Sequence, residues 1–339
     1  MTKTSSGERL LPASGAPAAP AVRQGGSQAP LAYLARFGLL GALLVLMAVL
    51  SVVAENFLTL SNLMNILLQA SNIGIMAAGL TLVVICAEID LSVASAQTLG
   101  AVIVAALMVR FDVPIPVAII VTLLAGLAIG SLSGLFVGTL GIPAFIVTLA
   151  MDSLLRGTSL ILTGETSIFG LPDAFAFLGQ GYVGPVPVAA IICGFVFLAV
   201  HLLLSHTVLG TNIYAVGGNK EAARIAGVNI FRVKLIVLAI SGFCGTLAGI
   251  VMASRLMAAQ AIMGLFDLMD VIAAVVIGGT SLLGGEGRII GTIIGTLTIA
   301  CIRNGLNLMG IPADWQLIAV GVIIMLAVLS DYAGRRAAQ

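Results

Sequence analysis

The chain has 339 residues, of which 60% are hydrophobic and 9% are charged, and its formal net charge is +1. A soluble domain carries about 25% charged residues, so the composition excludes an ordinary soluble protein and predicts an all-α, polytopic membrane helix bundle. The small net charge argues against a nucleic-acid partner. The four cysteines have no CxxC spacing, which argues against a metal site, and nothing in the sequence indicates a cofactor or a catalytic residue.

Residues 1–33 are rich in alanine, proline, serine and glycine and predict a disordered cytoplasmic N-terminal tail. A membrane domain is expected over 34–332, followed by a cytoplasmic C-terminal tail over 333–339. About ten segments approach the roughly 20 apolar residues that a spanning helix needs. They are 34–54, 62–86, 92–109, 115–139, 144–163, 187–205, 234–255, 268–281, 288–306 and 315–331, of which the eighth is short.

An even number of spans places both termini on the same side of the membrane, and the basic residues indicate which side. With the termini in the cytoplasm, most of the basic residues are inside: Lys3, Arg9, Arg23, Arg36, Lys220, Arg224, Arg232, Lys234, Arg288, Arg335 and Arg336. Acidic residues show the opposite trend: Glu55, Asp112, Glu165, Asp173, Asp267 and Asp314 fall outside. The positive-inside rule therefore predicts cytoplasmic termini and a multi-pass protein of the inner membrane.

The loop 206–233 is a charged segment between two apolar spans. Asn219 is a good N-cap, the following residues favour a helix, and Gly227 can end it in the left-handed conformation. Small side chains would let the groove of a cytoplasmic partner approach the helix backbone. The predicted docking element comprises Gly218, Asn219, Lys220, Glu221, Ala222, Ala223, Arg224 and Gly227. An ordinary positive-inside loop is the alternative interpretation.

Acidic groups also lie within or next to the spans. Glu88 and Asp90 stand between the second and third spans, where Asp90 could cap the next helix; a proton or cation relay is the functional alternative. Asp152 and Arg156 are four residues apart and can pair on one helical face. We predict that this pair lines a polar translocation path, or else ties two helices together, and Asp270 raises the same choice.

Glycines recur at two places that matter for function. The turn 277–287 is glycine-rich but lacks the lysine of a nucleotide-binding loop, so ATP binding is not expected there. Gly126, Gly130, Gly134 and Gly138 are spaced by four and predict a close helix contact.

The longest external loop, 164–187, predicts either a short surface or re-entrant helix that meets an external partner, or a plain connector.

Taken together, these segments resemble the permease subunits of bacterial ABC importers for ribose-like sugars. The stretches that carry the resemblance are 88–95 (EIDLSVAS), 141–157 (GIPAFIVTLAMDSLLRG), 214–228 (YAVGGNKEAARIAGV) and 270–292 (DVIAAVVIGGTSLLGGEGRIIGT), with Asn304, Gly305, Leu306 and Asp331 near the end. The resemblance covers about residues 35–332. It implies an ABC importer permease fold in which the docking element is the coupling helix.

The resemblance also implies partners: a separate ATPase subunit, a periplasmic or lipid-anchored solute-binding protein, a second permease copy and membrane lipid. The chain would import a monosaccharide or polyol by alternating access and would not itself be an enzyme. Three positions depart from the family pattern, namely Glu88, Asp152 and Leu268, where glycine, a small or neutral residue and glutamate are usual. A proton-coupled secondary transporter that uses Glu88, Asp90, Asp152 and Asp270 is the alternative function.

Overall fold

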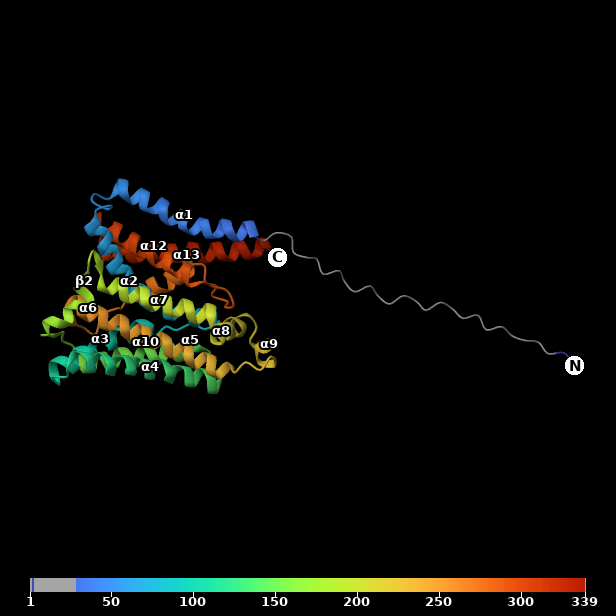
Figure 1. Ribbon diagram of the computed structural model, residues 1–339, viewed down its shortest axis with the longest axis horizontal. Coiled ribbons are helices and arrows are strands. Elements are labelled where there is room, and N and C mark those ends of the chain that lie inside the picture. Colours follow the sequence, from blue (N-terminus) through green and yellow to red (C-terminus); the bar gives the residue numbers. More distant parts are fainter. Residues whose placement is uncertain (1, 3–28, 339) are drawn as a thin grey trace. The chain divides into compact units, whose positions relative to one another are not determined.

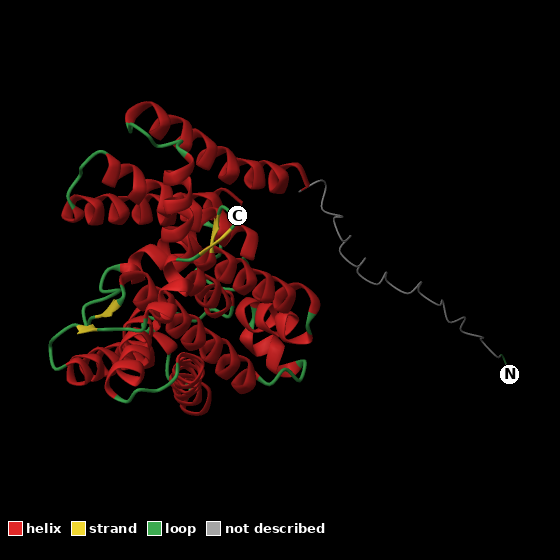
Figure 2. Cartoon of the chain, turned by 60° about the vertical axis from the view of Figure 1, so that its left-hand side comes forward, coloured by secondary structure: helices red, strands yellow, loops and turns green. Residues whose placement is uncertain are grey.

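The computed structural model describes residue 2 and residues 29–338, with side chains described at residue 2 and over 38–325. The helices are α1 (Ala29–Val53), α2 (Leu60–Ile85), α3 (Val93–Arg110), α4 (Ile115–Leu140), α5 (Ala144–Thr163), α6 (Phe177–Gln180), α7 (Val188–His206), α8 (Val208–Gly218), α9 (Lys220–Ile225), α10 (Ile230–Leu256), α11 (Asp267–Ile277), α12 (Ile289–Leu308) and α13 (Ala313–Ala338), with a 3-10 helix η1 (Asp173–Ala176). The strands, β1 (Ile168–Phe169), β2 (Tyr182–Val183), β3 (Val186–Pro187) and β4 (Ala258–Ala259), are minor additions to the helical bundle (Figures 1 and 2).

Seven of the described helices, α2, α3, α4, α5, α7, α10 and α12, are long and apolar enough to cross a membrane. Shorter apolar helices cover Gly38–Val53 and Ala313–Met325, the described parts of α1 and α13. This confirms the prediction of a polytopic helical membrane protein. The predicted eighth span, 268–281, corresponds to α11, which has only 11 residues and is preceded by irregular backbone.

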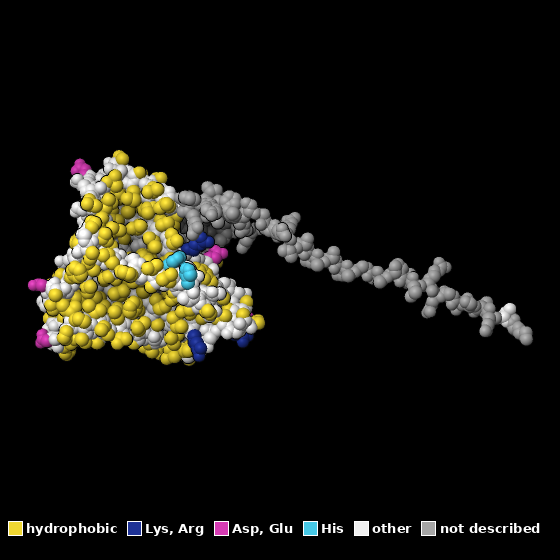
Figure 3. Space-filling model, in the orientation of Figure 1, with side chains coloured by type: hydrophobic (Ala, Val, Ile, Leu, Met, Phe, Trp, Pro, Cys, Tyr) yellow, Lys and Arg dark blue, Asp and Glu magenta, His cyan; other side chains and the backbone are white. Residues whose placement is uncertain are grey.

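The outer surface of these helices is apolar, as a lipid environment requires. Many large hydrophobic side chains of α4, α5 and α7 are exposed, and hydrophobic atoms cover most of the face shown in Figure 3. Acidic side chains stand out mainly at the end of this view that carries β2 and α6, while basic and histidine side chains gather at the end that carries α8 and α9 (Figures 1 and 3). The bundle therefore has two chemically different ends.

Helices α4 and α10 lie side by side along much of their length (Figure 1). The glycine row of α4 makes this contact: a Cβ atom at Gly130 would lie 2.1 Å from the carbonyl oxygen of Leu238, and one at Gly134 would lie 2.6 Å from the Cα atom of Leu235. The prediction of a close helix contact is confirmed, and its partner is α10. Helix α10 also packs against α2 and α3, which makes it the central helix of the bundle.

The predicted external loop, 164–187, is more than a plain connector. It contains η1, α6 and the β2–β3 hairpin, and β1 pairs with β4 beyond α10. The Ser254 hydroxyl at the end of α10 donates to the Phe175 carbonyl, 2.5 Å away, and accepts a hydrogen bond from the Gly179 backbone N–H at 2.8 Å. These bonds fasten the short helices of the loop to the end of α10.

Two features differ from the sequence-based boundaries. The predicted loop 206–233 contains an additional helix, α8, which Thr207 caps by accepting a hydrogen bond from the Gly210 N–H. The predicted N-terminal tail falls largely on residues that the structure does not describe, although helix α1 already includes 29–33. The predicted C-terminal tail is part of helix α13 as far as Ala338. The side chains of Lys3, Arg9, Arg23, Arg36, Asp331, Arg335 and Arg336, which entered the predicted orientation and resemblance, lie outside the described side chains.

We expect Gly130→Ala to loosen the α4–α10 contact, because the new methyl group would meet backbone that cannot move away without separating the helices. Overpacking of this kind costs roughly 1–3 kcal/mol. The thermal unfolding temperature of the detergent-solubilised protein should fall. Gly157→Ala on α5 is the matched control, since a Cβ atom at that position would have open space within 4 Å; equal temperatures for the two variants would contradict the role of the contact.

Candidate functional site

The predicted docking element forms a short, capped helix, α9. Asn219 is its N-cap and accepts a hydrogen bond from the Ala222 N–H at 2.9 Å. Gly227 follows the helix with φ +83° and is exposed, which explains why a glycine ends this segment. The sequence-based prediction of this helix and of both its ends is confirmed.

The outward face of α9 presents a charged pair and small residues. Glu221 and Arg224 form an ion pair and are both exposed, whereas Ala223 is buried against the bundle. Hydrogen bonding to Arg224 holds the pKa of the Glu221 carboxyl below its ordinary value, and the same contact raises the pKa of Arg224. A lowered carboxyl pKa means that the pairing is present at neutral pH and is lost only as the pH falls through that lowered pKa.

Helix α8 fixes this surface to the rest of the bundle. A Cβ atom at Gly217 would lie 1.8 Å from the carbonyl oxygen of Ile85, so α8 touches the backbone at the end of α2. That same carbonyl accepts a hydrogen bond from the Gly285 N–H at 2.8 Å, and the Tyr214 hydroxyl donates to the Gly287 carbonyl at 2.8 Å. The glycine-rich turn 277–287 therefore packs against the predicted docking region.

Glu88 does not line an open route. Its carboxylate forms a buried ion pair with Lys234 of α10 and accepts a hydrogen bond from the Ala144 N–H at the start of α5. The pair joins the α2–α3 loop to α5 and α10 close to the docking region. Lys234 was assigned to the cytoplasmic loop by its charge, but its side chain is 5% exposed.

Asp90 does not cap α3, so the capping interpretation is wrong. The N-cap of α3 is Ser92, which makes no side-chain capping bond. The Asp90 carboxylate instead accepts hydrogen bonds from the Ser92 N–H and hydroxyl, at 2.8 and 2.6 Å, and from the Ser241 hydroxyl of α10 at 2.6 Å. Asp90 is therefore a buried tie between the α2–α3 loop and α10.

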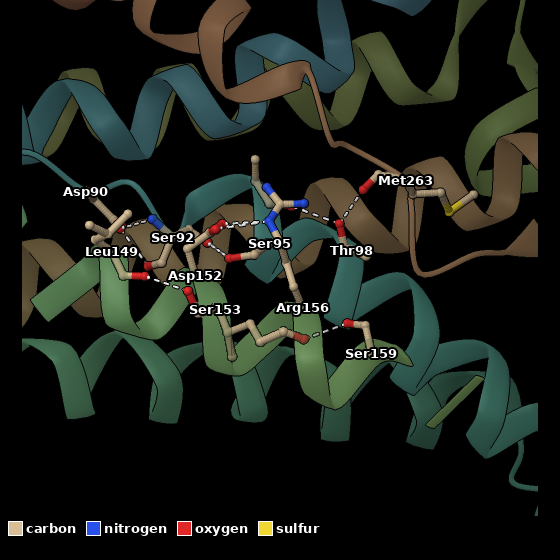
Figure 4. Close-up of polar contacts among 12 residues, drawn as sticks. Asp90, Ser92, Ser95, Thr98, Leu149, Asp152, Ser153, Arg156, Ser159 and Met263 are labelled. Atoms are coloured by element: carbon tan, nitrogen blue, oxygen red, sulfur yellow. Dashed lines mark hydrogen bonds and ion pairs between the residues drawn. The ribbon is translucent and has the colours of Figure 1, made fainter. Parts of the chain in front are cut away.

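Asp152 and Arg156 pair on α5, as predicted, with Nε–O distances of 3.1 and 3.0 Å. Figure 4 shows both side chains directed from α5 toward the first turns of α3, where Ser95 and Thr98 are fully buried. Each member of the pair is about one fifth exposed, and the Nη1 atom of Arg156 is buried without a hydrogen-bond partner among the described residues. The pair is thus a partly accessible polar patch between α3 and α5.

Asp270 does not join the Asp152–Arg156 pair. It lies in the first turn of α11, is 1% exposed, and forms an ion pair with Arg303 of α12 at 2.5 Å. No local signal in the sequence indicated the role of Arg303, because its partner is far away in the sequence. The contact fastens the short helix α11 to α12.

The cysteines Cys86, Cys193, Cys244 and Cys301 are free and buried. Among the described residues, no group of three or more histidine, cysteine, aspartate or glutamate side chains is arranged to hold a metal ion.

An apolar helical bundle with charged groups paired within it and a capped helix at one end defines a multi-pass membrane protein. The family described as "Branched-chain amino acid transport system / permease component" matches residues 62–328, and the chain belongs to this family. No solved structure matches the chain.

The curated relatives are permease proteins of import and transport systems. The chain is 46% identical over 295 residues to the ribose import permease protein of Escherichia coli strain K12, covering 86% of this chain and 91% of the relative. It is 38% identical over 291 residues to the ribose import permease protein of Bacillus subtilis strain 168, with coverages of 85% and 90%. The xylose transport system permease protein of Escherichia coli strain K12 is 33% identical over 341 residues, with coverages of 83% and 87%.

Replacing one member of the Glu88–Lys234 pair should be more harmful than replacing both. Glu88→Gln or Lys234→Met alone leaves one buried charge without its partner, a loss of roughly 3–5 kcal/mol in comparable pairs. The double variant Glu88→Gln/Lys234→Met should recover most of the thermal stability of the detergent-solubilised protein. Additive losses in this double-mutant cycle would mean that the two side chains do not depend on each other.

Proposed function

We propose that this chain is the membrane permease subunit of an ATP-driven, binding-protein-dependent importer of a ribose-like monosaccharide or polyol. The observation that carries the proposal is the 46% identity to a ribose import permease over 86% of the chain. The capped helix α9, which offers a cytoplasmic partner an exposed surface, supports it. ATP hydrolysis then takes place on a separate ATPase subunit.

We propose that the protein crosses the bacterial inner membrane ten times. The proposed crossings are the seven long apolar helices together with α1, α11 and α13, which correspond to the remaining hydrophobic segments of the sequence. Both termini lie in the cytoplasm. The charge difference between the two ends of the bundle supports this orientation, since basic groups gather at the end that carries α8 and α9 (Figure 3). The permease domain spans 34–332 between two short cytoplasmic tails.

The docking element transmits the motion of the ATPase. The residues involved are Gly218, Asn219, Lys220, Glu221, Ala222, Ala223, Arg224 and Gly227. Helix α9 is followed after four residues by α10 and is preceded by α8, which touches the end of α2. A displacement of α9 therefore acts directly on two long helices, and packed helices move as units in such transitions.

We propose that the partner assembly contains a second permease copy, forming a homodimer, and a solute-binding protein on the outside. The external surface contributed by the 164–187 loop and the β1–β4 pair is suited to the latter role. A cavity of about 220 Å³ lies there, lined by Leu160, Glu165, Thr166, Ser167, Gln260, Ala261 and Ile262. Delivery of the sugar from the binding protein would occur at this end.

Asp152, Arg156 and Asp270 are proposed as polar elements along the path. Asp152 and Arg156 are partly accessible and can contact a passing solute, whereas buried Asp270 acts by holding α11 on α12. A conducting path benefits from several weak contacts more than from one tight site.

A proton-coupled mechanism is not supported. Glu88, Asp152 and Asp270 each face a basic partner, and Asp90 is held by two serine hydroxyls. Proteoliposomes that contain the permease with its ATPase and binding protein should accumulate ribose only when ATP is supplied. Uptake by the permease alone, driven by a pH gradient, would overturn the proposed function.

Gly227→Val should abolish co-purification of the ATPase while leaving the permease in the membrane. Valine is strained at φ +83°, so the end of α9 must change shape. Gly184→Val is the matched control, because Gly184 also has a positive φ, +60°, and open space around it but lies in the β2–β3 turn. Normal ATPase binding by the Gly227 variant would contradict the docking assignment.

Asp152→Ala should reduce ATP-driven uptake by roughly tenfold, because the partly exposed Arg156 loses a charge-assisted hydrogen bond worth about 1.5 kcal/mol. Assembly with the ATPase should change little, because the pair is remote from α9 in the sequence and touches α3 instead (Figure 4). Co-purification and uptake would be measured on the same preparation. Full uptake by this variant would remove Asp152 from the path.

A further inference from the structure

The backbone between β4 and α11 is irregular, and within it Met263 is buried against the bundle whereas Ile262, Leu265 and Phe266 are exposed. From β4, which pairs with β1 of the external loop, residues 260–266 run inward to the start of α11. The Thr98 hydroxyl of α3 donates to the Met263 carbonyl, and Figure 4 shows Met263 beside Thr98. Irregular backbone at membrane depth occurs where it is buried in protein or lines a water-filled cavity.

Three polar side chains meet where this segment turns into α11. Asp267 is the first residue of α11, Asn72 lies midway along the 26 residues of α2, and Gln97 lies in the second turn of α3. The Gln97 side-chain amide donates to Oδ2 of Asp267 at 3.0 Å, and the Asn72 amide donates to the same oxygen at 3.4 Å. We refer to Asn72, Gln97 and Asp267 as the amide–carboxylate cluster.

The cluster has more acceptor atoms than donors to fill them. Gln97 is 0% exposed and Asn72 is 7% exposed, yet the carbonyl oxygen of each side-chain amide has no hydrogen-bond partner among the described residues. The amide orientation is fixed chemically, since only the NH2 groups can face the carboxylate favourably. Both amides bond to Oδ2, so Oδ1 of Asp267 accepts no hydrogen bond from the described part of the chain.

The Asp267 carboxylate is accessible from outside the cluster. Asp267 is partly exposed, and the adjoining Leu265, Phe266 and Met269 are exposed as well. The Oε1 atom of Gln97 points at the bend at Gly264, where a Cβ would lie 2.7 Å away. An unfilled set of acceptors therefore borders an accessible carboxylate halfway along a spanning helix.

We propose that the amide–carboxylate cluster is a hydroxyl-binding site on the translocation path, at which Asp267 accepts hydrogen bonds from a polyhydroxylated solute. Asn72 and Gln97 orient the carboxylate, and their own carbonyl oxygens accept further hydroxyl protons when the segment 260–266 shifts during transport. Water competes for the carboxylate oxygens, so a hydrogen bond from a sugar hydroxyl contributes only a modest net free energy of binding. One such contact can therefore hold a neutral sugar briefly without trapping it. This inference rests on the proposed function and names a solute contact within it.

The test uses the full importer, permease with ATPase and binding protein, in proteoliposomes supplied with ATP and ribose. Asp267→Asn keeps the shape of the side chain but replaces one acceptor with a donor. Sugar delivered per ATP hydrolysed should fall roughly tenfold. ATP hydrolysis stimulated by the loaded binding protein, and the thermal unfolding temperature, should stay close to wild type. Asp314→Asn, an exposed acid in the first turn of α13, is the matched control and should retain full coupling.

Unchanged sugar delivery per ATP in Asp267→Asn would overturn the proposal, and so would a parallel loss of stability, hydrolysis and uptake, which indicates a purely structural role. If Asp267→Asn fails to assemble, the variants Gln97→Leu and Asn72→Leu provide the test, because both keep the Asp267 carboxylate. Each should lower the amount of sugar delivered per ATP hydrolysed. Wild-type values for both variants would refute the site. Absence of ATP-driven uptake by the wild-type complex would instead refute the proposed function, so the two failures are distinguishable.

Discussion

The contact of α10 with its neighbours is the constraint on which the rest of the bundle depends. Glycines of α4 bring the two backbones to a separation that no side chain permits, and α10 also lies against α2 and α3. Within a membrane the hydrophobic effect does not drive helices together, so close packing between small residues supplies much of the attraction between them. Because α10 begins directly after the α9 region, this central helix connects the docking surface to the interior.

Charged and polar ties reinforce that connection at one end of α10. Lys234 pairs with Glu88 and Ser241 bonds to Asp90, so two successive levels of α10 hold the α2–α3 loop. A buried charge is costly unless it is paired, so partial separation of Glu88 and Lys234 is unfavourable. The helices that carry them are therefore expected to move between discrete arrangements in which the pair is intact, rather than to deform gradually. These ties suit the proposed role of α10, which is to pass on a displacement of α9 while staying attached to its neighbours.

The charged and polar groups proposed to act in transport are distributed along the bundle from one end to the other. Helix α9 presents a charged and exposed surface, the Asp152–Arg156 pair and the amide–carboxylate cluster provide polar groups in the interior, and the 164–187 loop with its strands forms the opposite end. The segment 260–266 links the last two, since it starts at the β1–β4 pair and ends at Asp267. One continuous stretch of chain thus joins the proposed delivery end to the proposed path.

The sequence by itself determined what depends on neighbours within a few residues. Apolar length identified the seven long helices among the described residues, Asn219 and Gly227 marked the ends of α9, and the four-residue spacing placed Asp152 beside Arg156. Only the tertiary structure decided the long-range partners: Lys234 for Glu88, Arg303 for Asp270, and the meeting of α2, α3 and α11 at Asp267. Helical geometry fixes local pairs, whereas distant pairs depend on how the helices pack, which no local pattern in one sequence specifies.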